Sequence, residues 1–304
     1  MKKVLVTGSN GLLGQKIILG YASLPEWEII GTGLGPNRIT SNSDFSYVTL
    51  DITKRLDVLR VLEEQKPDVV INTAAMTNVD ACEDDPMGCD DLNVEAVKHL
   101  VEACEKIDAH LIHLSTDFIF DGKDGPYDEE DIPNPLSYYG KSKLFAEGIV
   151  MKSQCKWSIV RTVLVIGITE GMSRSNIILW AKGALGAGNE ISVVNDQFRT
   201  PTLAEDLADG CMLIAEKGEA GVFNISGKDF LSILEIVHQI ADYFGFDKSL
   251  IKEVSSETLN QRAKRPPVTG FKLDKAFEKL GYSPRSFRES IQIIDEQATS
   301  QKKV

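Results

Sequence analysis

Residues 1–14, MKKVLVTGSNGLLG, decide the expected fold of this chain. The run Val4–Val6 is apolar and contains β-branched residues, so it predicts a short strand. Gly8, Gly11 and Gly14 follow at a spacing of three, and an apolar helical pattern comes after them. A strand, a glycine turn and a helix in this order form the context that a dinucleotide-binding turn needs.

The glycine turn has the properties that a bound pyrophosphate requires. Without Cβ atoms, Gly8 can make the tight turn, Gly11 lets a phosphate approach the backbone, and Gly14 lets the helix pack close to the strand. The helix N-terminus adds free N–H groups and a partial positive charge. Such turns also occur without a ligand, and the first two glycines here are three apart instead of two, but their place directly after a strand favours a nucleotide site. The residues expected to bind cofactor here are Gly8, Asn10, Gly11, Leu12, Leu13 and Gly14.

The bulk composition excludes several classes of protein. The chain has 304 residues and is 42% hydrophobic, enough for one large α/β unit or two domains. A net charge of −12 argues against a general nucleic-acid or anionic-membrane surface. No apolar run reaches membrane-spanning length, and the N-terminus enters a strand at once instead of forming a signal peptide. The five cysteines lack CxxC spacing and the four histidines lack an HExxH pattern, so we expect reduced thiols, no catalytic metal and a cytoplasmic protein.

Strand and helix patterns alternate through the first half of the chain. Strands are expected at 3–7, 27–31, 47–50, 68–72, 110–114 and 157–165, and helices at 56–65, 93–107 and 137–150. This alternation predicts right-handed crossovers and a parallel sheet, hence an α/β Rossmann-type, doubly wound fold. We expect a cofactor-binding domain over 1–165, to which 200–225 returns, and a smaller, interleaved C-terminal α/β lobe for the substrate over 166–304, where the alternation weakens.

The end of the second expected strand bears on the choice of cofactor. It continues as GTGLGPNR, without the acidic residue that holds the ribose 2′-hydroxyl in NAD-selective folds. Arg38 suits a 2′-phosphate instead; the alternative is that it is simply a solvated loop cation. We therefore expect NADP(H) to be preferred and NAD(H) to be possible. The remaining expected cofactor residues are Arg38, Asp51, Ile52, Ala74, Ala75, Met76, Thr77, Asn93, Ser115, Tyr139 and Lys143.

Tyr139 and Lys143 are four residues apart on an expected helix, so they share a face. A tyrosine hydroxyl can exchange a proton with a carbonyl or alcohol, and a nearby ammonium would lower its pKa from about 10 toward neutral pH. Lys143 could also hold the nicotinamide ribose, and Thr116 at a strand end could bond the reacting oxygen. The Tyr–Lys spacing often arises by chance, and a lone threonine is more often a cap. The order of these residues after the glycine turn makes the combination specific.

Seven motifs over nearly the whole chain carry a family resemblance. They are TGSNGLLG at 7–14, NTAAMTNVDACE at 72–83, LSTDFIFDG at 114–122, YYGKSKLFAE at 138–147, VVNDQFRTPT at 193–202, VFNISG at 222–227 and KRP at 264–266. With them the chain resembles the extended short-chain dehydrogenase/reductases, and within these the dTDP-4-dehydrorhamnose reductase family. The resemblance implies that Thr116, Tyr139 and Lys143 are catalytic, that residues 75–77 line the cofactor, and that Thr116 and Asp117 touch the sugar.

Two positions depart from the family pattern. Leu164 stands where rhamnose-forming members usually carry a tryptophan that packs on the sugar, and Arg199 stands where a small residue is common. Both departures leave the identity of the sugar undecided. They are also compatible with a non-catalytic, NADP-binding member that resembles the regulatory β subunit of methionine adenosyltransferase. A sugar-nucleotide dehydratase or epimerase is a weaker alternative. Related dehydratases carry Asp-Glu after the threonine, whereas Asp117 and Phe118 follow Thr116 here.

The main hypothesis is an NAD(P)H-dependent reductase of a nucleotide-linked 4-keto-6-deoxy sugar. Ligands of parallel sheets lie beyond the carboxyl ends of the strands, so we expect the sugar between Thr116 and Tyr139. The nucleotide diphosphate should then run toward Asn176 and Arg199, because an arginine can pair with phosphate bidentately. Arg199 could equally make an ordinary interdomain ion pair. A nucleotide sugar is the expected partner, and a homodimer is one open possibility.

Overall fold

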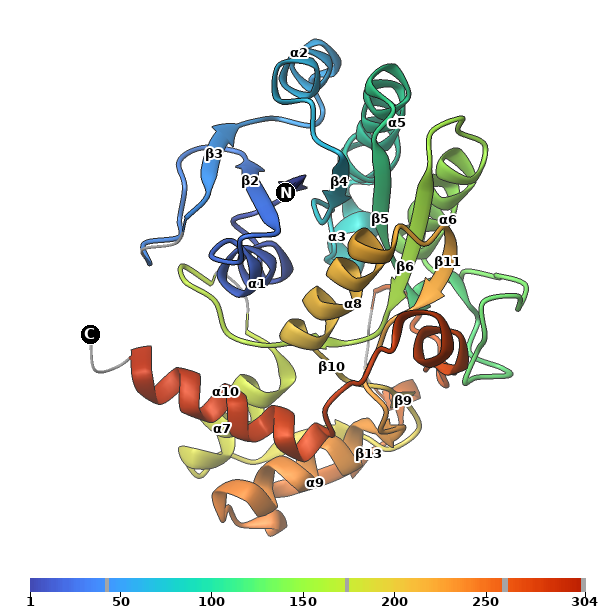
Figure 1. The fold of residues 1–304 in the computed structure, drawn as a ribbon. Helices are drawn as coiled ribbons and strands as arrows, with labels where there is room; N and C mark the ends of the chain where they lie inside the picture. The colour runs from blue at the N-terminus through green and yellow to red at the C-terminus, as the bar shows by residue number, and fades with distance from the viewer. Residues whose placement is uncertain (42–43, 173–174, 259–261, 302–304) are drawn as a thin grey trace.

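A seven-stranded parallel sheet forms the centre of the molecule (Figure 1), in a computed structural model that describes residues 1–41, 44–172, 175–258 and 262–301. Its strand order is β11-β6-β5-β4-β1-β2-β3. The strands are β1 (Lys2–Thr7), β2 (Trp27–Gly33), β3 (Ser46–Thr49), β4 (Val69–Asn72), β5 (His110–Thr116), β6 (Trp157–Thr162) and β11 (Gly221–Asn224). The expected Rossmann-type, doubly wound α/β fold is therefore confirmed.

Helices cover both faces of this sheet. On one face lie α1 (Leu12–Tyr21) and α8 (Ala204–Lys217), which pack against each other, and on the other lie α2 (Arg55–Gln65), α5 (Ala96–Ile107) and α6 (Tyr138–Met151). Strand residues alternate between the two layers: Val4 and Val6 belong to the core under α1 and α8, whereas Leu5 belongs to the core under α2 and α5. Continuous apolar strands such as β1 arise because both faces are covered.

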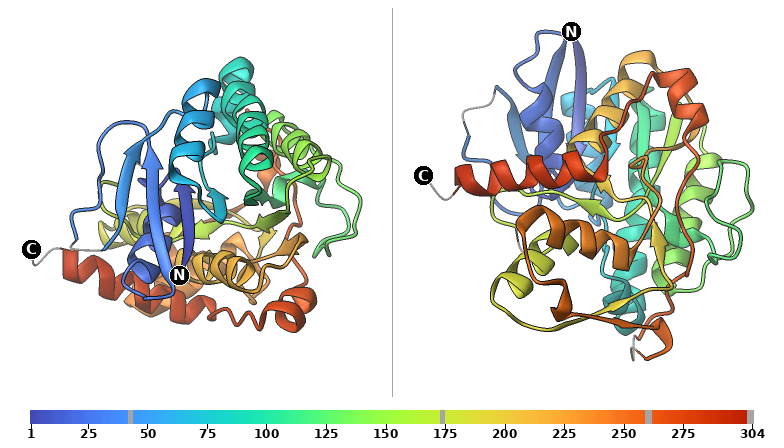
Figure 2. Two further views of the ribbon diagram at one scale, coloured as in Figure 1. Left: turned by 45° about the horizontal axis from the view of Figure 1, so that its top comes forward. Right: turned by 90° about the horizontal axis from the view of Figure 1, so that it is seen from below.

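Segments of the C-terminal half other than α8 and β11 form a third hydrophobic cluster, which lies below the sheet in Figure 1. It contains α7 (Ile177–Gly186), α9 (Ile233–Phe244) and α10 (Phe287–Gln301), and Figure 2 shows α9 and α10 side by side. Short strand pairs complete it: β7 (Val165–Ile166) with β10 (Thr202–Leu203), β8 (Ile191–Val194) with β13 (Ile251–Val254), and β9 (Phe198–Arg199) with β12 (Leu231–Ser232). Ser232 and Glu235 form a capping box that starts α9.

The structure departs from the expected elements in two places near the carboxyl edge of the sheet. The strand expected over 157–165 is broken, because Leu164 has a left-handed backbone (φ 37°) between β6 and β7. Two short helices that the sequence did not suggest, α3 (Val79–Asp84) and α4 (Pro86–Asp90), precede a π-helical turn (Asp91–Glu95) that leads into α5. Asn78 and Asp85 cap these helices with side-chain oxygens.

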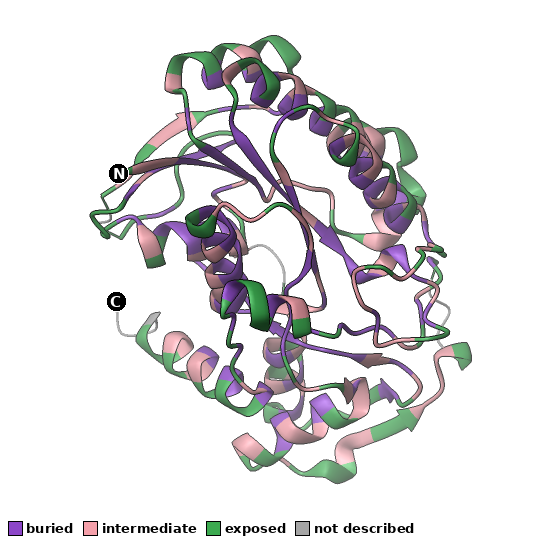
Figure 3. Ribbon diagram, turned by 45° about the vertical axis from the view of Figure 1, so that its right-hand side comes forward, coloured by how far each residue is buried: buried purple, intermediate pink, exposed green. Residues whose placement is uncertain are grey.

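Burial follows the layers. In Figure 3 the sheet is buried along most of its length, and the helices are buried on the side that faces it and exposed on the other. This distribution is the amphipathic pattern expected of a doubly wound fold. Within the described residues, no helix combines the length and the apolarity that a membrane span needs.

Candidate functional site

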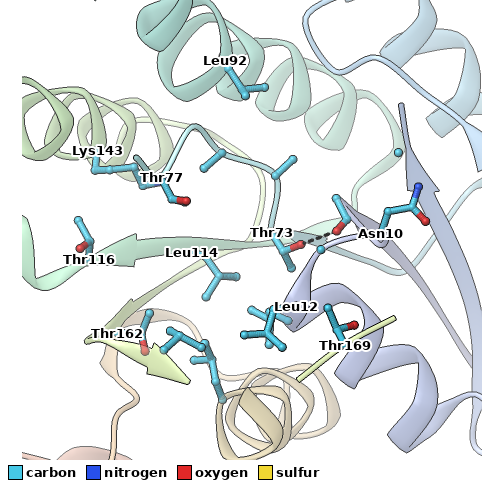
Figure 4. A pocket seen from close by; sticks show the side chains of 18 of the residues that line it. Asn10, Leu12, Thr73, Thr77, Leu92, Leu114, Thr116, Lys143, Thr162 and Thr169 are labelled. Carbon is cyan, nitrogen blue, oxygen red and sulfur yellow. Dashed lines mark hydrogen bonds between the residues drawn. The ribbon is translucent and has the colours of Figure 1, made fainter. Parts of the chain in front are cut away.

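A cavity of about 830 Å³ lies at the carboxyl ends of the parallel strands. It is formed by the turn after β1, the ends of β4, β5 and β6, the start of α6 and the loop after β7. Figure 4 shows Thr116 and Lys143 toward one end of the cavity and Asn10 toward the other. The expected residues that line it are Gly8, Asn10, Gly11, Leu12, Leu13, Arg38, Asp51, Ile52, Ala74, Ala75, Thr77, Ser115, Thr116, Asp117, Tyr139, Lys143 and Asn176.

The glycine turn packs directly against the backbone that follows β4. Gly8 has a φ of +64°, and a Cβ atom there would lie 2.9 Å from the backbone of Ala74. Gly11 is the N-cap of helix α1 and offers no side-chain hydrogen bond, so the helix N-terminus presents backbone N–H groups at the cavity wall. This arrangement suits a diphosphate. Among the described residues, no group of three or more His, Cys, Asp or Glu side chains could hold a metal ion.

Arg38 lies exposed at the rim of the cavity, on the loop after β2. Asn10 braces this loop: its Oδ1 accepts a hydrogen bond from Arg38 N at 2.9 Å, and its Nδ2 donates to Pro36 O at 3.0 Å. The Tyr47 hydroxyl completes the brace by donating to Gly35 O at 2.9 Å. The loop that carries Arg38 is therefore attached to the glycine turn itself, which the sequence alone did not reveal.

Three expected site residues lie just behind the cavity wall, among the residues that the structure describes. A Cβ atom on Gly14 would lie 2.5 Å from Ser9 Cα, so this glycine permits close packing of α1. Asn93 accepts a hydrogen bond from Met76 N at 2.8 Å and donates to Met76 O at 3.0 Å. These two bonds hold the backbone between Ala75 and Thr77, so Asn93 and Met76 shape the wall without lining it.

The structure brings Thr116, Tyr139 and Lys143 together. Ser137 caps α6 through a hydrogen bond from Gly140 N, which places Tyr139 in the first turn. A Cβ atom on Gly140 would lie 2.2 Å from Phe118 O, so only glycine lets α6 approach the end of β5 this closely. Thr116, Tyr139 and Lys143 are 6%, 8% and 3% exposed.

Burial dominates the pKa shifts of both Tyr139 and Lys143. It raises the pKa of Tyr139 above its ordinary value, although a hydrogen bond with the Thr116 side chain acts in the opposite direction. Burial also lowers the pKa of Lys143 to about 8, and the charge of Glu147 opposes that shift. The expected net shift of the Tyr139 pKa toward neutral pH is therefore wrong for this structure, because desolvation of the phenolate dominates. Tyr139 keeps its proton at neutral pH.

The expectation that Arg199 binds a phosphate is also corrected by the structure. Arg199 is 4% exposed and is not among the described residues that line the cavity. Its guanidinium donates to the carbonyl oxygens of Phe198, Pro266 and Pro267 at 2.7, 2.8 and 3.0 Å. Its Nε lies 3.8 Å from Asp117 Oδ2. The arginine joins the segment around Pro266 to the end of β5, and its donors are used within the protein.

Asp117 lines the cavity but is bonded on several sides. Its Oδ1 accepts a hydrogen bond from Thr116 Oγ1 at 3.1 Å, and its Oδ2 accepts one from Thr269 Oγ1 at 2.5 Å. Burial raises the pKa of Asp117, whereas the charge of Arg199 and these hydrogen bonds act to lower it. The carboxylate therefore orients the Thr116 hydroxyl from behind as well as facing the cavity.

Asn176 lies at the cavity as the N-cap of α7. Its Oδ1 accepts hydrogen bonds from Ile178 N and Leu179 N, and its Nδ2 donates to Gly167 O at 2.6 Å. The side chain is thus occupied in starting the helix. What it brings to the cavity is the N-terminal end of α7.

Two buried hydroxyl groups at the cavity have no hydrogen-bond partner among the described residues. They belong to Ser115, which was expected at the site, and to Thr169, which was not. Gln15 on α1 fixes the loop that carries Thr169, because its amide donates to Glu170 O at 2.9 Å and accepts from Glu170 N at 3.2 Å. The sequence carried no signal for Thr169, since it lies in an irregular loop. Further lining residues that the sequence did not suggest include Thr73, Leu114, Phe118, Thr162 and Leu207, and Leu164, which stands at the place of the family's sugar-packing tryptophan, also lines the cavity.

Comparison with known proteins identifies relatives along the whole chain. A family model described as RmlD substrate binding domain matches residues 1–299. Methionine adenosyltransferase 2 subunit beta of Mus musculus is 30% identical over 298 residues, 95% of this chain and 86% of that protein. A dTDP-4-dehydrorhamnose reductase of Aggregatibacter actinomycetemcomitans is 30% identical and covers 97% of this chain and 98% of its own. The crystal structure of dTDP-4-dehydrorhamnose reductase from Bacillus anthracis in complex with NADP has a TM-score of 0.84 at 27% identity, covering 98% and 100% of the two chains.

Proposed function

Since this chain belongs to the RmlD substrate binding domain family, we propose that it is an NAD(P)H-dependent reductase of a nucleotide-linked 4-keto-6-deoxy sugar, like dTDP-4-dehydrorhamnose reductase. The observation that carries this function is the grouping of Thr116, Tyr139 and Lys143 in one cavity with the glycine turn. Fold alone would not distinguish a reductase from a binding protein, whereas a proton donor beside a dinucleotide site does favour a reductase.

The residues present fit a nicotinamide dinucleotide. The uncapped start of α1 and the close turn at Gly8 suit its diphosphate, and the small side chains of Ala74 and Ala75 let it pass along the end of β4. Arg38 at the rim would pair with the 2′-phosphate of NADP(H), which favours this cofactor over NAD(H). When bound, the reduced cofactor supplies a hydride to the carbonyl carbon of the sugar.

The side chains of this chain supply the proton. The Tyr139 hydroxyl donates it to the carbonyl oxygen as the oxygen becomes an alcohol, and the raised pKa of Tyr139 keeps that proton in place until then. The hydroxyl hydrogen of Thr116 can turn from Asp117 toward the same oxygen and stabilise its developing charge. The Lys143 ammonium stabilises the tyrosinate that remains, before a proton from solvent restores Tyr139.

We place the sugar between Thr116 and Tyr139, next to Leu164, with the cofactor held mainly by residues 1–165. The diphosphate of the substrate then points toward the N-terminal end of α7 at Asn176, and most substrate contacts come from 166–304. The five cysteines are free and buried, which suits a reducing compartment such as the cytoplasm. Sedimentation at several concentrations would distinguish a monomer from a homodimer.

A panel of nucleotide-linked 4-keto-6-deoxy sugars, assayed for consumption of NADPH, tests the proposal. We expect turnover of at least one member and its loss in Tyr139→Phe. Consumption of NADPH by none of them, with tight NADP(H) binding, would contradict the reductase. In that case an altered rate of a methionine adenosyltransferase catalytic subunit would support the regulatory alternative, and a new sugar formed without net oxidation of NADPH would support an epimerase or dehydratase.

A further inference from the structure

A row of buried polar side chains crosses three neighbouring strands behind Lys143. Lys143 Nζ lies 3.2 Å from His113 Nε2, and His113 Nδ1 lies 3.1 Å from Asn72 Nδ2. Asn72 Oδ1 accepts a hydrogen bond of 2.6 Å from Thr7 Oγ1. Thr7, Asn72 and His113 are paired in register across β1, β4 and β5, and none of them is more than 1% exposed.

The two contacts of His113 are coupled by the chemistry of its ring. An uncharged imidazole has one N–H donor and one acceptor nitrogen. If Lys143 is an ammonium, Nε2 accepts its hydrogen, Nδ1 carries the ring proton, and Asn72 must present its amide oxygen. If Lys143 is a neutral amine, its nitrogen gains a lone pair that can accept, so Nε2 is able to donate to Nζ while Nδ1 accepts from the Asn72 amide nitrogen, which is the atom that faces it in the structure. A half-turn of the amide exchanges these arrangements, and the Thr7 hydroxyl serves both because it can donate or accept.

We propose that His113 is a positioning residue for Lys143, and that its ring, with the tautomer set by Asn72, holds Nζ at the cavity that Tyr139 also lines in both charge states of the lysine. A buried ammonium without an acceptor would be strongly disfavoured. The row therefore lets Lys143 remain a cation while Tyr139 gives up its proton. When Lys143 becomes a neutral amine, its hydrogen bond with His113 is kept. The importance of this for turnover rests on the proposed reductase function.

The charges around the pair agree with this role. The groups that act on the pKa of Lys143 besides burial are Glu147, on the same helix, and the Cys89 thiol of α4. Glu147 is itself held by Arg161, at 2.9 Å. Burial, and after it the charge of Lys143, holds the pKa of the His113 imidazole well below its ordinary value. The histidine thus stays neutral while the lysine, with a pKa of about 8, can change its charge.

Nuclear magnetic resonance of protein labelled with ¹⁵N-histidine tests the coupling without any need for turnover. The chain has four histidines, and His113→Gln identifies the signals of His113. We expect the ring proton of His113 to move from Nδ1 to Nε2 as the pH rises through about 8, and this change to disappear in Lys143→Met. His110 is the matched control, since it is buried on the same strand but bonds Ser158 Oγ at 2.8 Å. A His113 tautomer that is constant with pH, or that changes equally in Lys143→Met, would overturn the proposal.

The pH profile of kcat provides a second measurement. His113→Leu removes the ring nitrogen that accepts from Lys143 and so disfavours the Lys143 ammonium. The alkaline limb of the kcat profile should therefore move to lower pH by about one to two units. His113→Gln keeps an acceptor and should restore the limb, whereas His110→Leu should leave it in place. Equal profiles for the wild type and His113→Leu would overturn the proposal. If no sugar nucleotide is reduced at all, the reductase function fails, and the histidine titration still decides the role of His113.

Discussion

Replacing Arg199 by methionine tests whether this arginine stabilises the fold or binds a phosphate of the substrate. Methionine keeps much of the side-chain volume but removes the charge and every donor. Asp117 then loses the cation that lies 3.8 Å away, and the three carbonyl oxygens of Phe198, Pro266 and Pro267 lose their hydrogen bonds. If the guanidinium holds the fold together, the variant should lose stability before it loses affinity for substrate.

The expected loss of stability is large because both charges are buried. Removing one partner of a buried ion pair costs about 3–5 kcal/mol. For a chain of this size, each kcal/mol lowers Tm by roughly 2–4 °C, so Tm should fall by at least about 6 °C. Arg262→Met is a matched control, on an arginine four residues before Pro266 in the chain. Its side chain is 70% exposed and pairs with Asp84, so its removal should cost less than about 1 kcal/mol.

The difference in stability between the wild type and Arg199→Met should depend on pH in a defined direction. Burial raises the pKa of Asp117 in the folded protein above its value in the unfolded chain. Between these two pKa values the folded state binds more protons, so its stability falls as the pH rises. Loss of Arg199 raises the folded pKa further and widens this window. The Tm deficit of Arg199→Met should therefore be greatest at neutral pH and should shrink as the pH falls toward the unfolded pKa of about 4.

Thermal unfolding followed by circular dichroism at several pH values, with kinetics on a responsive sugar nucleotide, completes the test. The double variant Arg199→Met, Asp117→Asn should recover part of the lost stability, because the unpaired charge is gone. A variant with wild-type Tm and a much higher KM for the nucleotide sugar would refute this reasoning. It would return Arg199 to the role of a phosphate ligand.

Three further changes test other parts of the site. Tyr139→Phe should lower kcat by about 10²–10⁴-fold and leave the Kd for NADP(H) nearly unchanged; near-normal turnover would remove Tyr139 from the mechanism. Arg38→Ala should reduce the ratio of the Kd values for NAD(H) and NADP(H), and an unchanged ratio would mean that Arg38 is only a solvated loop cation. Gly14→Ala places a Cβ atom 2.5 Å from backbone and should weaken cofactor binding and lower Tm, whereas Gly20→Ala, with nothing within 4 Å, should leave cofactor binding unchanged and should not lower Tm; equal effects would contradict the packing argument.

The sequence by itself determined the sheet, the glycine turn and the helix face that carries Tyr139 and Lys143, because each depends on local periodicity. The apolar run before Gly8 and the glycine spacing predicted β1 and the start of α1, and the helical period placed Tyr139 and Lys143 on one face. The order of these segments along the chain also determined where they meet, since parallel strands bring their carboxyl ends to one edge. The family resemblance rested on these same segments.

Tertiary structure alone decided what each polar group faces. Arg38 and Arg199 are both loop or short-strand cations in the sequence, yet the first is exposed at the cavity and the second is buried against carbonyl groups some 67 residues away. His110 and His113 stand three residues apart on one strand, so their side chains point to opposite faces of the sheet: His113 meets Lys143 of α6, whereas His110 bonds Ser158. Periodicity predicts which residues share a face. Desolvation and charge pairing depend on which distant segments pack together, and these decide a pKa or the role of a cation.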